Sequence, residues 1–417
     1  REALGAAARV AAARGLRAYL VGGTVRDVLA GGGGGRRDLD VVVEGDGLAL
    51  ARDLAAALGA GASLVEHARF LTASVTADGL GRIDVATARA ERYERPGALP
   101  RVMPATIAHD LARRDFTVNA MAVALGAGGL TLLDPFGGRD DLARRRLRVL
   151  HPLSFVEDPT RMFRAARYAA RLGFGADAWT ARAQALAVRL APYPALSGQR
   201  LTAEIDLILG DAQPSAALRR LGVAGVFRLL DPRYRFGRAT TERLNALAAG
   251  LAWCREQGLR VGPVELAALA LLTDQAREVA PAALTRLGFR GEPLASLARA
   301  LESAPTLARA LDAASRASVR AGLLRERSDV ELAWLALVGG AAGRAAVEWF
   351  VSTARPARPA LGGDAVVALG VPRGAAVARV LAALRDGRLD GALRDRDDEE
   401  RFVRDWVREA DGEREEA

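Results

Sequence analysis

The pattern of apolar and polar positions predicts an α+β protein, with its strands near the N-terminus and helices in the remainder. Residues 38–43 pair an acidic start with a β-branched run, which is typical of a strand. The other predicted strands are 18–21, 64–76 and 82–87. From residue 159 the apolar spacing is helical almost to the end, with breaks at the Gly/Pro clusters 191–197 and 355–363. A further segment, 94–104, is rich in Pro, Gly and Arg and predicts a mobile loop.

Composition supports this division and adds a hint about partners. The 417 residues are rich in Ala, Leu and Arg, which favour helix, and only 5% are aromatic. All 59 basic residues are arginines, and the net charge of +9 suits a polyanionic partner such as nucleic acid.

The sequence also bears on compartment. The single cysteine, Cys254, excludes an internal disulfide framework and a Cys-rich zinc site, as expected in the cytoplasm. No apolar run is long enough to span a bilayer and no secretory leader is recognisable. A start at Arg1 suggests that further residues precede it.

A glycine turn near the N-terminus is the first candidate for chemistry. Gly22 and Gly23 end a predicted strand and precede a helix that carries Arg26 and ends at the glycine run 31–35. Glycines there let backbone N–H groups approach phosphates at a helix N-terminus. The alternative is an ordinary turn.

Two aspartates on the next strand are the second candidate. Side chains alternate along a strand, so Asp38 and Asp40 lie on one face. Neighbouring carboxylates repel unless a cation lies between them, which suits a pair of Mg²⁺ ions for phosphoryl transfer. Asp84, on the predicted strand 82–87, is either a third carboxylate of this site or an exposed strand residue.

The third candidate is the polar cluster of residues 110–122. Arg113, Arg114, Asp115 and Asn119 lie within apolar flanks, where polar groups are costly to bury without a polar partner. Arg114 could neutralise phosphate charge and Asp115 could accept hydrogen bonds from ribose hydroxyls. The alternative is an exposed salt-bridge cluster on a helix.

The fourth candidate is the segment 157–169. Asp158 followed by a proline predicts a helix start, with the aspartate as N-cap. Arg161, Arg164 and Arg167 recur every three residues and spiral over one side of that helix, among Met, Phe and Tyr. This pattern indicates the wall of a basic groove.

In this order and spacing, the four features resemble the class II tRNA nucleotidyltransferase and bacterial poly(A) polymerase family, a branch of the DNA polymerase beta superfamily. The resemblance covers residues 18–174 and includes the link Leu-Leu-Asp-Pro-Phe-Gly-Gly at 132–138. It implies a sheet-and-helix nucleotidyltransferase head at 1–140. The head would be followed by three all-α parts. These are a neck for base recognition at 141–208, an RNA-binding body at 209–330 and a tRNA-binding tail at 331–417. The stretch 31–37 is longer and richer in glycine than is usual in the family.

The resemblance also implies roles for residues. Asp38 and Asp40 would coordinate two Mg²⁺ ions, and Asp115 would select ribose. With Asp84 added from the strand argument, the expected catalytic residues are Asp38, Asp40, Asp84 and Asp115. The expected nucleotide-binding residues are Gly22, Gly23, Arg26, Arg114, Asp115, Asp158, Arg161, Arg164 and Arg167.

Asp158 and Arg161 suit template-independent base recognition, because cytosine and adenine both offer an amino donor beside a ring-nitrogen acceptor. A carboxylate and a guanidinium satisfy both bases, whereas uracil and guanine present the reverse order. The resemblance implies CTP, ATP and the 3′ end of tRNA as partners.

Within the family, residues 64–73 and the loop near 89–97 are similar to the tRNA branch. The expected activity is addition of C, C and A to tRNA. The alternatives are a partial enzyme that adds only CC or only A, a poly(A) polymerase, and a catalytically silent RNA-binding protein.

Overall fold

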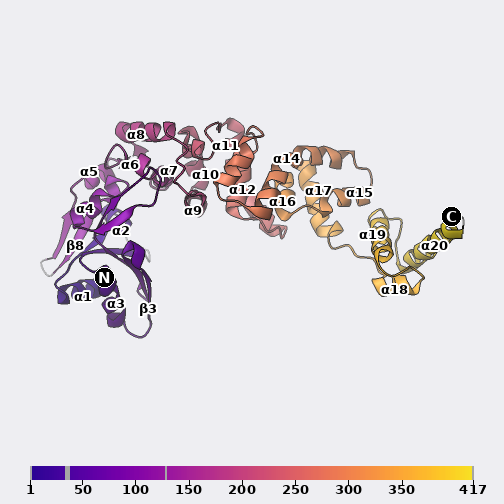
Figure 1. Cartoon of the computed structure of the whole chain (residues 1–417), viewed down its shortest axis with the longest axis horizontal. Coiled ribbons are helices and arrows are strands. Elements are labelled where there is room, and N and C mark those ends of the chain that lie inside the picture. The colour runs from indigo at the N-terminus through magenta and orange to yellow at the C-terminus, as the bar shows by residue number, and fades with distance from the viewer. Residues whose placement is uncertain (1, 33–37, 127–128, 416–417) are drawn as a thin grey trace. The chain divides into compact units, whose positions relative to one another are not determined.

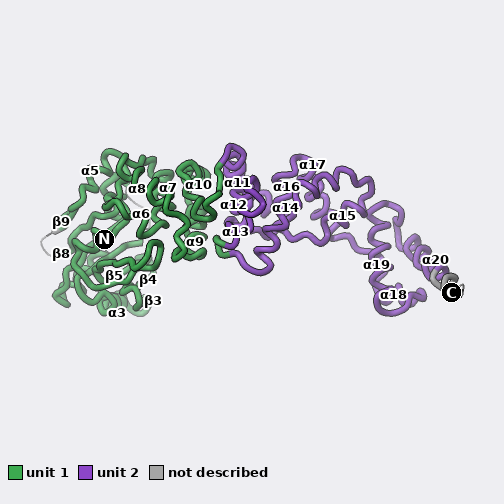
Figure 2. The backbone as a smooth tube through the Cα atoms, turned by 45° about the horizontal axis from the view of Figure 1, so that its top comes forward, with its two compact units in different colours: residues 1–236, 286–288 green, residues 237–285, 289–417 purple. Residues whose placement is uncertain are grey.

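A computed structural model describes residues 2–32, 38–126 and 129–415. The chain forms two compact units (Figure 2). Unit 1 comprises residues 1–236 and 286–288, and unit 2 comprises residues 237–285 and 289–417. Among the described helices, none combines the length and apolar character needed to cross a bilayer. The division into four domains at 140, 208 and 330 stays a prediction.

Unit 1 is built on a seven-stranded mixed sheet in the order β3-β4-β5-β2-β1-β8-β9. Its strands are β1 Arg17–Val21, β2 Leu39–Glu44, β3 Ala62–His67, β4 Thr72–Ala77, β5 Gly81–Thr87, β8 Ala122–Gly126 and β9 Gly129–Leu133. Among the described residues of this seven-stranded sheet, only β2 and β5 pair in parallel. Two small sheets accompany it, formed by β6 Arg89–Arg92 with β7 Arg101–Pro104 and by β10 Arg146–Leu147 with β11 Gly175–Ala176. The sheet-and-helix head predicted from the sequence is confirmed.

Alternation along β2 gives the sheet two different faces. Val41 and Val43 pack with the buried residues of α1 (Glu2–Ala13) and α3 (Gly47–Leu58), which cover one face (Figure 1). Val42 packs on the other face, with Ile107 and Leu111 of α4 (Ile107–Ala112). Because Asp40 shares the parity of Val42, the strand directs its carboxylate away from α3.

Two sequence predictions were wrong in detail. The predicted strand 64–76 is a hairpin of β3 and β4, joined by a 3₁₀ turn at Ala68–Phe70 and by Leu71 with φ 55°. The predicted loop 94–104 ends in strand β7, which pairs with β6. Of the glycine-rich stretch 31–37, residues 33–37 lie outside the described part of the chain.

Helices complete unit 1. They are α2 Gly23–Leu29, α5 Gly138–Ala143, α6 Ser154–Glu157, α7 Thr160–Leu172, α8 Ala178–Arg189, α9 Gly198–Leu209 and α10 Pro214–Val223. The rings of Phe116, Phe155 and Tyr168 pack together, and Tyr168 belongs to α7. The ring centroid of Phe116 lies 6.0 Å from that of Tyr168 and 6.3 Å from that of Phe155. This aromatic cluster fixes α7 against the segment that follows α4, and thereby sets the position of the arginines on α7.

Helices are the only regular secondary structure among the described residues of unit 2. Its helices are α11 Arg238–Glu256, α12 Pro263–Leu272, α13 Val279–Arg286, α14 Gly291–Ala313, α15 Ala317–Arg325, α16 Asp329–Val338, α17 Gly340–Trp349, α18 Gly363–Ala368, α19 Ala375–Leu389 and α20 Arg396–Glu415. One apolar core joins α11, α14, α16 and α17, and a second lies among α18, α19 and α20. Helix α16 is buried nearly all round, as its continuous apolar sequence predicts.

Candidate active site

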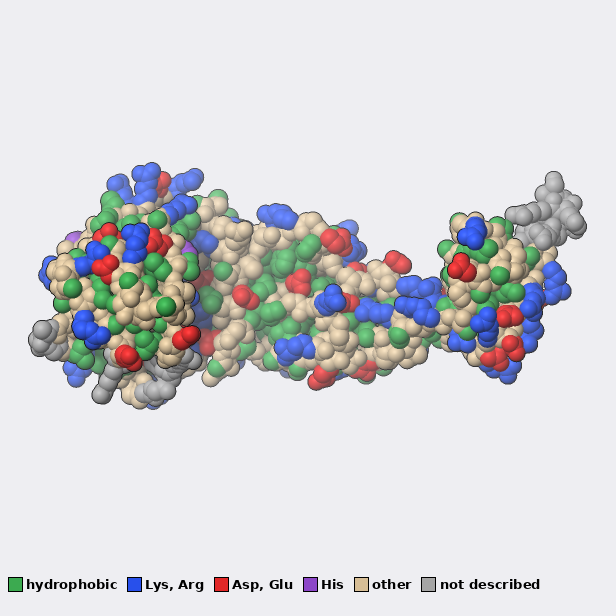
Figure 3. Space-filling view, turned by 90° about the horizontal axis from the view of Figure 1, so that it is seen from below, with side chains coloured by type: hydrophobic (Ala, Val, Ile, Leu, Met, Phe, Trp, Pro, Cys, Tyr) green, Lys and Arg blue, Asp and Glu red, His purple; other side chains and the backbone are tan. Residues whose placement is uncertain are grey.

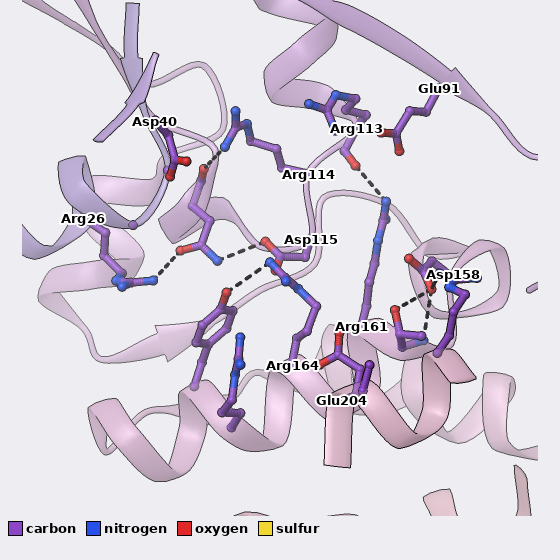
Figure 4. A pocket seen from close by; sticks show the side chains of 18 of the residues that line it. Arg26, Asp40, Glu91, Arg113, Arg114, Asp115, Asp158, Arg161, Arg164 and Glu204 are labelled. Carbon is purple, nitrogen blue, oxygen red and sulfur yellow. Dashed lines mark hydrogen bonds and ion pairs between the residues drawn. The ribbon is translucent and has the colours of Figure 1, made fainter. Parts of the chain in front are cut away.

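A cavity of about 600 Å³ in unit 1 collects most of the predicted site residues (Figure 4). Ten of them line it: Gly22, Gly23, Arg26, Asp40, Arg114, Asp115, Asp158, Arg161, Arg164 and Arg167. They come from the turn between β1 and α2, from α2, from β2, from the segment after α4, from the junction of α6 and α7, and from α7. Asp38 and Asp84 are not among the lining residues.

The turn between β1 and α2 lies directly beside the carboxylate of Asp40. Gly22 has φ 74°, a left-handed conformation that favours glycine. A Cβ atom added to Gly22 would lie 3.3 Å from Asp40 Oδ2 and 3.3 Å from the Arg114 guanidinium. The glycine thus leaves room for backbone, carboxylate and guanidinium to approach one another.

Asp40 is a partly buried carboxylate with no hydrogen-bond donor among the described residues. Its pKa is raised, first by burial, and then by Asp84 and Asp38 against the opposing charge of Arg114. Asp40 and Asp84 are register partners on β2 and β5, so their side chains share a face. A carboxylate that is desolvated and repelled by two others fits a divalent cation, which would relieve both effects.

The other two carboxylates differ from Asp40. Asp38 precedes β2 and is exposed, and its backbone carbonyl accepts a hydrogen bond from the Thr24 hydroxyl at 3.1 Å. Asp84 Oδ1 already accepts bonds from Ser74 Oγ at 2.6 Å and Arg82 Nε at 2.8 Å. Within the described ranges, no group of three or more His, Cys, Asp or Glu side chains is arranged to hold a metal ion. A metal would therefore depend on two carboxylates and on oxygens of a bound nucleotide, and the role of Asp84 stays a prediction.

A buried hydrogen-bonded chain connects the glycine turn with α7. Arg26 donates to Asn119 Oδ1 at 2.6 Å, and the Asn119 amide donates to Asp115 Oδ1 at 3.0 Å. Asp115 Oδ2 in turn accepts from Arg164 Nε at 2.8 Å. Burial alone would raise the pKa of Asp115, but Arg164 and Asn119 outweigh it, so the pKa lies below its usual range. Asp115 is therefore an anion that aligns two arginines of the cavity.

The cluster after α4 is buried, which contradicts the alternative of an exposed salt-bridge cluster. Asp110 is fully buried and pairs with Arg113 at 2.7 Å and with Arg114 at 2.9 Å. Arg114 Nε is buried with no acceptor among the described residues. Arg113, Arg114, Asp115 and Asn119 of this segment line the cavity.

Four arginines lie around the ring of Tyr168, which belongs to α7. Arg26, Arg164, Arg167 and Arg171 have their guanidinium carbons 5.4–5.5 Å from the ring centroid. Each contact is a cation–π interaction, but four like charges around one ring repel one another. The predicted basic groove wall is confirmed, and its charge suits a polyphosphate.

Asp158 has an acceptor oxygen, and Arg161 has N–H donors, that no described residue engages. Asp158 Oδ1 accepts from the Thr160 N–H at 3.1 Å, the Thr160 hydroxyl at 2.7 Å and Arg200 at 2.8 Å, and no described residue donates to Oδ2. Three N–H groups of Arg161 donate to Ser154 Oγ, to the Arg113 carbonyl and to the Tyr93 hydroxyl. A guanidinium has five donors, so two remain. The N-cap prediction is confirmed by geometry, because Asp158 has extended φ and ψ and accepts from the Thr160 N–H, whereas Pro159 already has helical φ and ψ.

Sequence reasoning missed Arg200 and Glu204, which α9 brings to the cavity. They lie four residues apart on one helix, after Ser197, whose side chain caps α9. That spacing places both on one face, but it does not indicate which element they meet. Glu204 Oε2 is buried with no hydrogen-bond partner among the described residues.

The comparisons with known proteins agree with this geometry. Residues 18–148 match the model of the poly A polymerase head domain. The A-adding tRNA nucleotidyltransferase of Geobacter sulfurreducens is 36% identical over 399 residues, which cover 93% of this chain and 45% of that protein. The CC-adding tRNA nucleotidyltransferase of Deinococcus radiodurans is 36% identical over 403 residues, which cover 93% of this chain and 89% of that protein.

A solved structure extends the likeness to both units. The structure described as a Thermotoga maritima CCA-adding enzyme complexed with tRNA matches with a TM-score of 0.76 and 29% identity, over 96% of this chain and 93% of that one. The chain spans about half or less of the length of A-adding relatives, with 45%, 49% and 28% covered in three of them.

Proposed function

Because the chain belongs to the family of tRNA nucleotidyltransferases and bacterial poly(A) polymerases, we propose that it adds C, C and A to the 3′ end of tRNA in the cytoplasm, using CTP and ATP and releasing pyrophosphate. One observation carries the proposal. The partly buried Asp40, without a donor among the described residues, lines the same cavity as the arginines gathered around Tyr168. A carboxylate for a cation and a basic wall for a triphosphate are the two parts that nucleotidyl transfer requires.

We assign Asp38 and Asp40 as ligands of two Mg²⁺ ions, which when bound would lower the pKa of the RNA 3′ hydroxyl and neutralise charge on the triphosphate. The glycine turn supplies backbone N–H groups at the start of α2 for the phosphates. We assign positive charge for the triphosphate to Arg26, Arg114, Arg164 and Arg167, and the acceptance of a ribose hydroxyl to Asp115, which lines the same cavity.

We assign base recognition to Asp158 and Arg161. Asp158 Oδ2, to which no residue in the described ranges donates, can accept the exocyclic amino group of cytosine or adenine. The two remaining donors of Arg161 can serve the adjacent ring nitrogen. Uracil and guanine would set carbonyl oxygen against carboxylate, at a cost of about 1–3 kcal/mol for each unpaired buried group.

A second candidate is a partial reaction. The relatives that match over nearly the whole chain include one named for adding A and one named for adding CC. Both activities need the same cation site and basic wall, so this cavity is compatible with either. A catalytically silent protein would have no use for a destabilised carboxylate such as Asp40.

The test uses the purified chain with three tRNA transcripts that lack CCA, CA or only A, with Mg²⁺ and labelled nucleotides. Full activity extends all three and stops at the completed end. An A-adding enzyme extends only the transcript that lacks A, and a CC-adding enzyme stops after two cytidines. Long A tails would indicate a poly(A) polymerase, and no incorporation with any transcript would reject nucleotidyl transfer. Chelation with EDTA should abolish every reaction.

A further inference from the structure

Asn119 lines the cavity of unit 1 and has no role in the reaction proposed above. It is buried at the end of the 3₁₀ turn Thr117–Asn119. Arg26 Nη1 donates to its Oδ1 at 2.6 Å, and its Nδ2 donates to Asp115 Oδ1 at 3.0 Å. The dashed lines of Figure 4 run from Arg26 through this amide to Asp115. One amide thus connects the arginine assigned to the triphosphate with the aspartate assigned to ribose.

The charges on its two partners fix the orientation of this amide. The opposite orientation would set donor against donor at Arg26 and acceptor against acceptor at Asp115. A carboxylate at position 119 would repel Asp115, and an apolar side chain would leave two buried charged groups without this partner. Asn119 therefore meets a requirement for an acceptor and a donor on one short side chain.

The backbone that carries Asn119 is held in place by the helix that follows the sheet, α5. The Thr117 hydroxyl donates to Asp141 Oδ2 at 2.7 Å, and the Thr117 N–H donates to the Arg148 carbonyl at 2.9 Å. At Gly138, the first residue of α5, an added Cβ would lie 2.2 Å from the Thr117 carbonyl oxygen, so helix and turn are in close contact. The position of the amide is therefore set by the fold of the head and does not depend on a bound ligand.

Asn119 also determines which oxygen of Asp115 remains for a ligand. Oδ1 accepts from the Phe116 N–H at 2.8 Å and from Asn119, and these two bonds occupy its two lone pairs. Oδ2 accepts from Arg164 Nε at 2.8 Å, and no described residue other than Arg164 donates to it. A ligand hydroxyl can therefore be accepted at Oδ2 but not at Oδ1.

We propose that Asn119 is a positioning residue for the choice of ribose over deoxyribose. Its amide holds Asp115 with Oδ2 available to a sugar hydroxyl, and Arg26 in turn holds the amide. A site built to accept a hydroxyl discriminates against an analogue without it only while the acceptor stays in place. The role of Asp115 toward ribose rests on the proposed function, whereas the bridge between Asp115 and Arg26 does not.

The test compares ribonucleotide and deoxyribonucleotide incorporation by wild type and by Asn119→Asp. This substitution keeps the size of the side chain and the acceptor for Arg26, but it replaces the donor to Asp115 by a second acceptor. The preference for CTP over dCTP and for ATP over dATP is measured as a ratio of kcat/KM values. We expect it to fall by about tenfold, because a hydrogen bond to a charged group is lost. A merely structural role would lower kcat/KM for both sugars equally.

The matched control is Asn245→Asp, at an exposed position of α11. Acidic and basic side chains are interspersed on the face shown in Figure 3, so one added surface carboxylate is a mild change. This control should keep the ribose preference of wild type. An unchanged preference in Asn119→Asp would overturn the proposal.

A second pair of variants tests the bridge without a substitution at position 119. Arg26 and Arg167 are both assigned to the triphosphate, but of the two only Arg26 donates to Asn119 within the described residues. Both Arg26→Gln and Arg167→Gln should raise the KM for nucleotides, and only Arg26→Gln should also lower the ribose preference. Equal ribose preference in these two variants would reject the bridge, even if Asn119→Asp does not fold.

The outcomes for wild type separate this inference from the proposed function. Wild-type protein that extends tRNA equally well with ribonucleotides and deoxyribonucleotides would contradict only the ribose role of Asp115 and Asn119. Failure to extend tRNA with any nucleotide would contradict the proposed function itself.

Discussion

Arg200 and Asp158 form an ion pair of 2.8 Å in which the acceptor is Oδ1, the same oxygen that accepts both bonds from Thr160. Nη2 of Arg200 forms this ion pair, and its Nη1 donates at 2.9 Å to the carbonyl of Gly97, in the segment between β6 and β7. Arg200 therefore holds one carboxylate oxygen in place and leaves the other for a ligand. It is a positioning residue for Asp158, and it connects that residue with the 94–104 segment.

We expect Arg200→Met to weaken the choice of cytosine and adenine over uracil and guanine. A charged hydrogen bond of this kind contributes about 1.5–3 kcal/mol, and its loss lets the carboxylate rotate. Discrimination, measured as the ratio of kcat/KM values, should fall by about tenfold or more. The variant Arg182→Met, on an exposed arginine of α8, is the control. A merely structural role would lower kcat/KM for all four nucleotides equally.

The variant Asp40→Asn should reduce nucleotide addition by at least about a thousandfold, because an amide cannot replace the carboxylate as a cation ligand. Removing a partly buried charge with a raised pKa should leave the fold intact or slightly stabilised. Binding of tRNA, measured by filter retention, should stay close to wild type. Asp78→Asn, at an exposed position of the head, provides the control. Addition at the wild-type rate by Asp40→Asn would refute the metal role.

The variant Arg161→Ala should relax selectivity against UTP and GTP. Its loss also leaves the Arg113 carbonyl and Ser154 hydroxyl without their donor, so a destabilisation of about 1–3 kcal/mol is expected. Nucleotide competition assays below the unfolding temperature separate the two effects, because instability lowers activity with every nucleotide alike. Unchanged discrimination in a folded variant would remove Arg161 from base recognition.

The sequence predicted the residues of the cavity well because the relevant patterns are local. A period of two places Asp40 on the face opposite Val41, and a strand, a glycine turn and a helix follow from a few adjacent residues. The sequence did not predict the hairpin within 64–76, because its turn contains no Gly, Pro, Asn or Asp. In that turn Leu71 itself adopts the left-handed conformation.

The sequence did not predict Arg200 as a cavity residue for a different reason. Its partners Asp158 and Gly97 are 42 and 103 positions away along the chain. Such contacts depend on how α9 packs against α7, and single-sequence periodicity carries no information on that packing.

Glu204 permits a test of the electrostatics of the cavity that needs no substrate. Its pKa is raised, first by burial and then by Asp158 and Asp115, while Arg164 and Arg167 on α7 oppose the shift. A carboxyl whose folded pKa exceeds its unfolded value stabilises the fold when protonated, and this contribution is lost as pH rises through the folded pKa. Glutamine mimics the protonated form at every pH.

The variant Glu204→Gln should therefore melt higher than wild type at pH 7–8, on the order of 2–4 °C. The difference should vanish as pH falls below about 4.3, where wild-type Glu204 is protonated in both states. Thermal melts across this pH range provide the measurement, with Glu94→Gln, on a side chain that is 57% exposed, as the matched substitution. A lower melting temperature for Glu204→Gln at neutral pH would mean that the charges of Arg164 and Arg167 outweigh burial, and that Glu204 is a structural counter-ion of the basic wall.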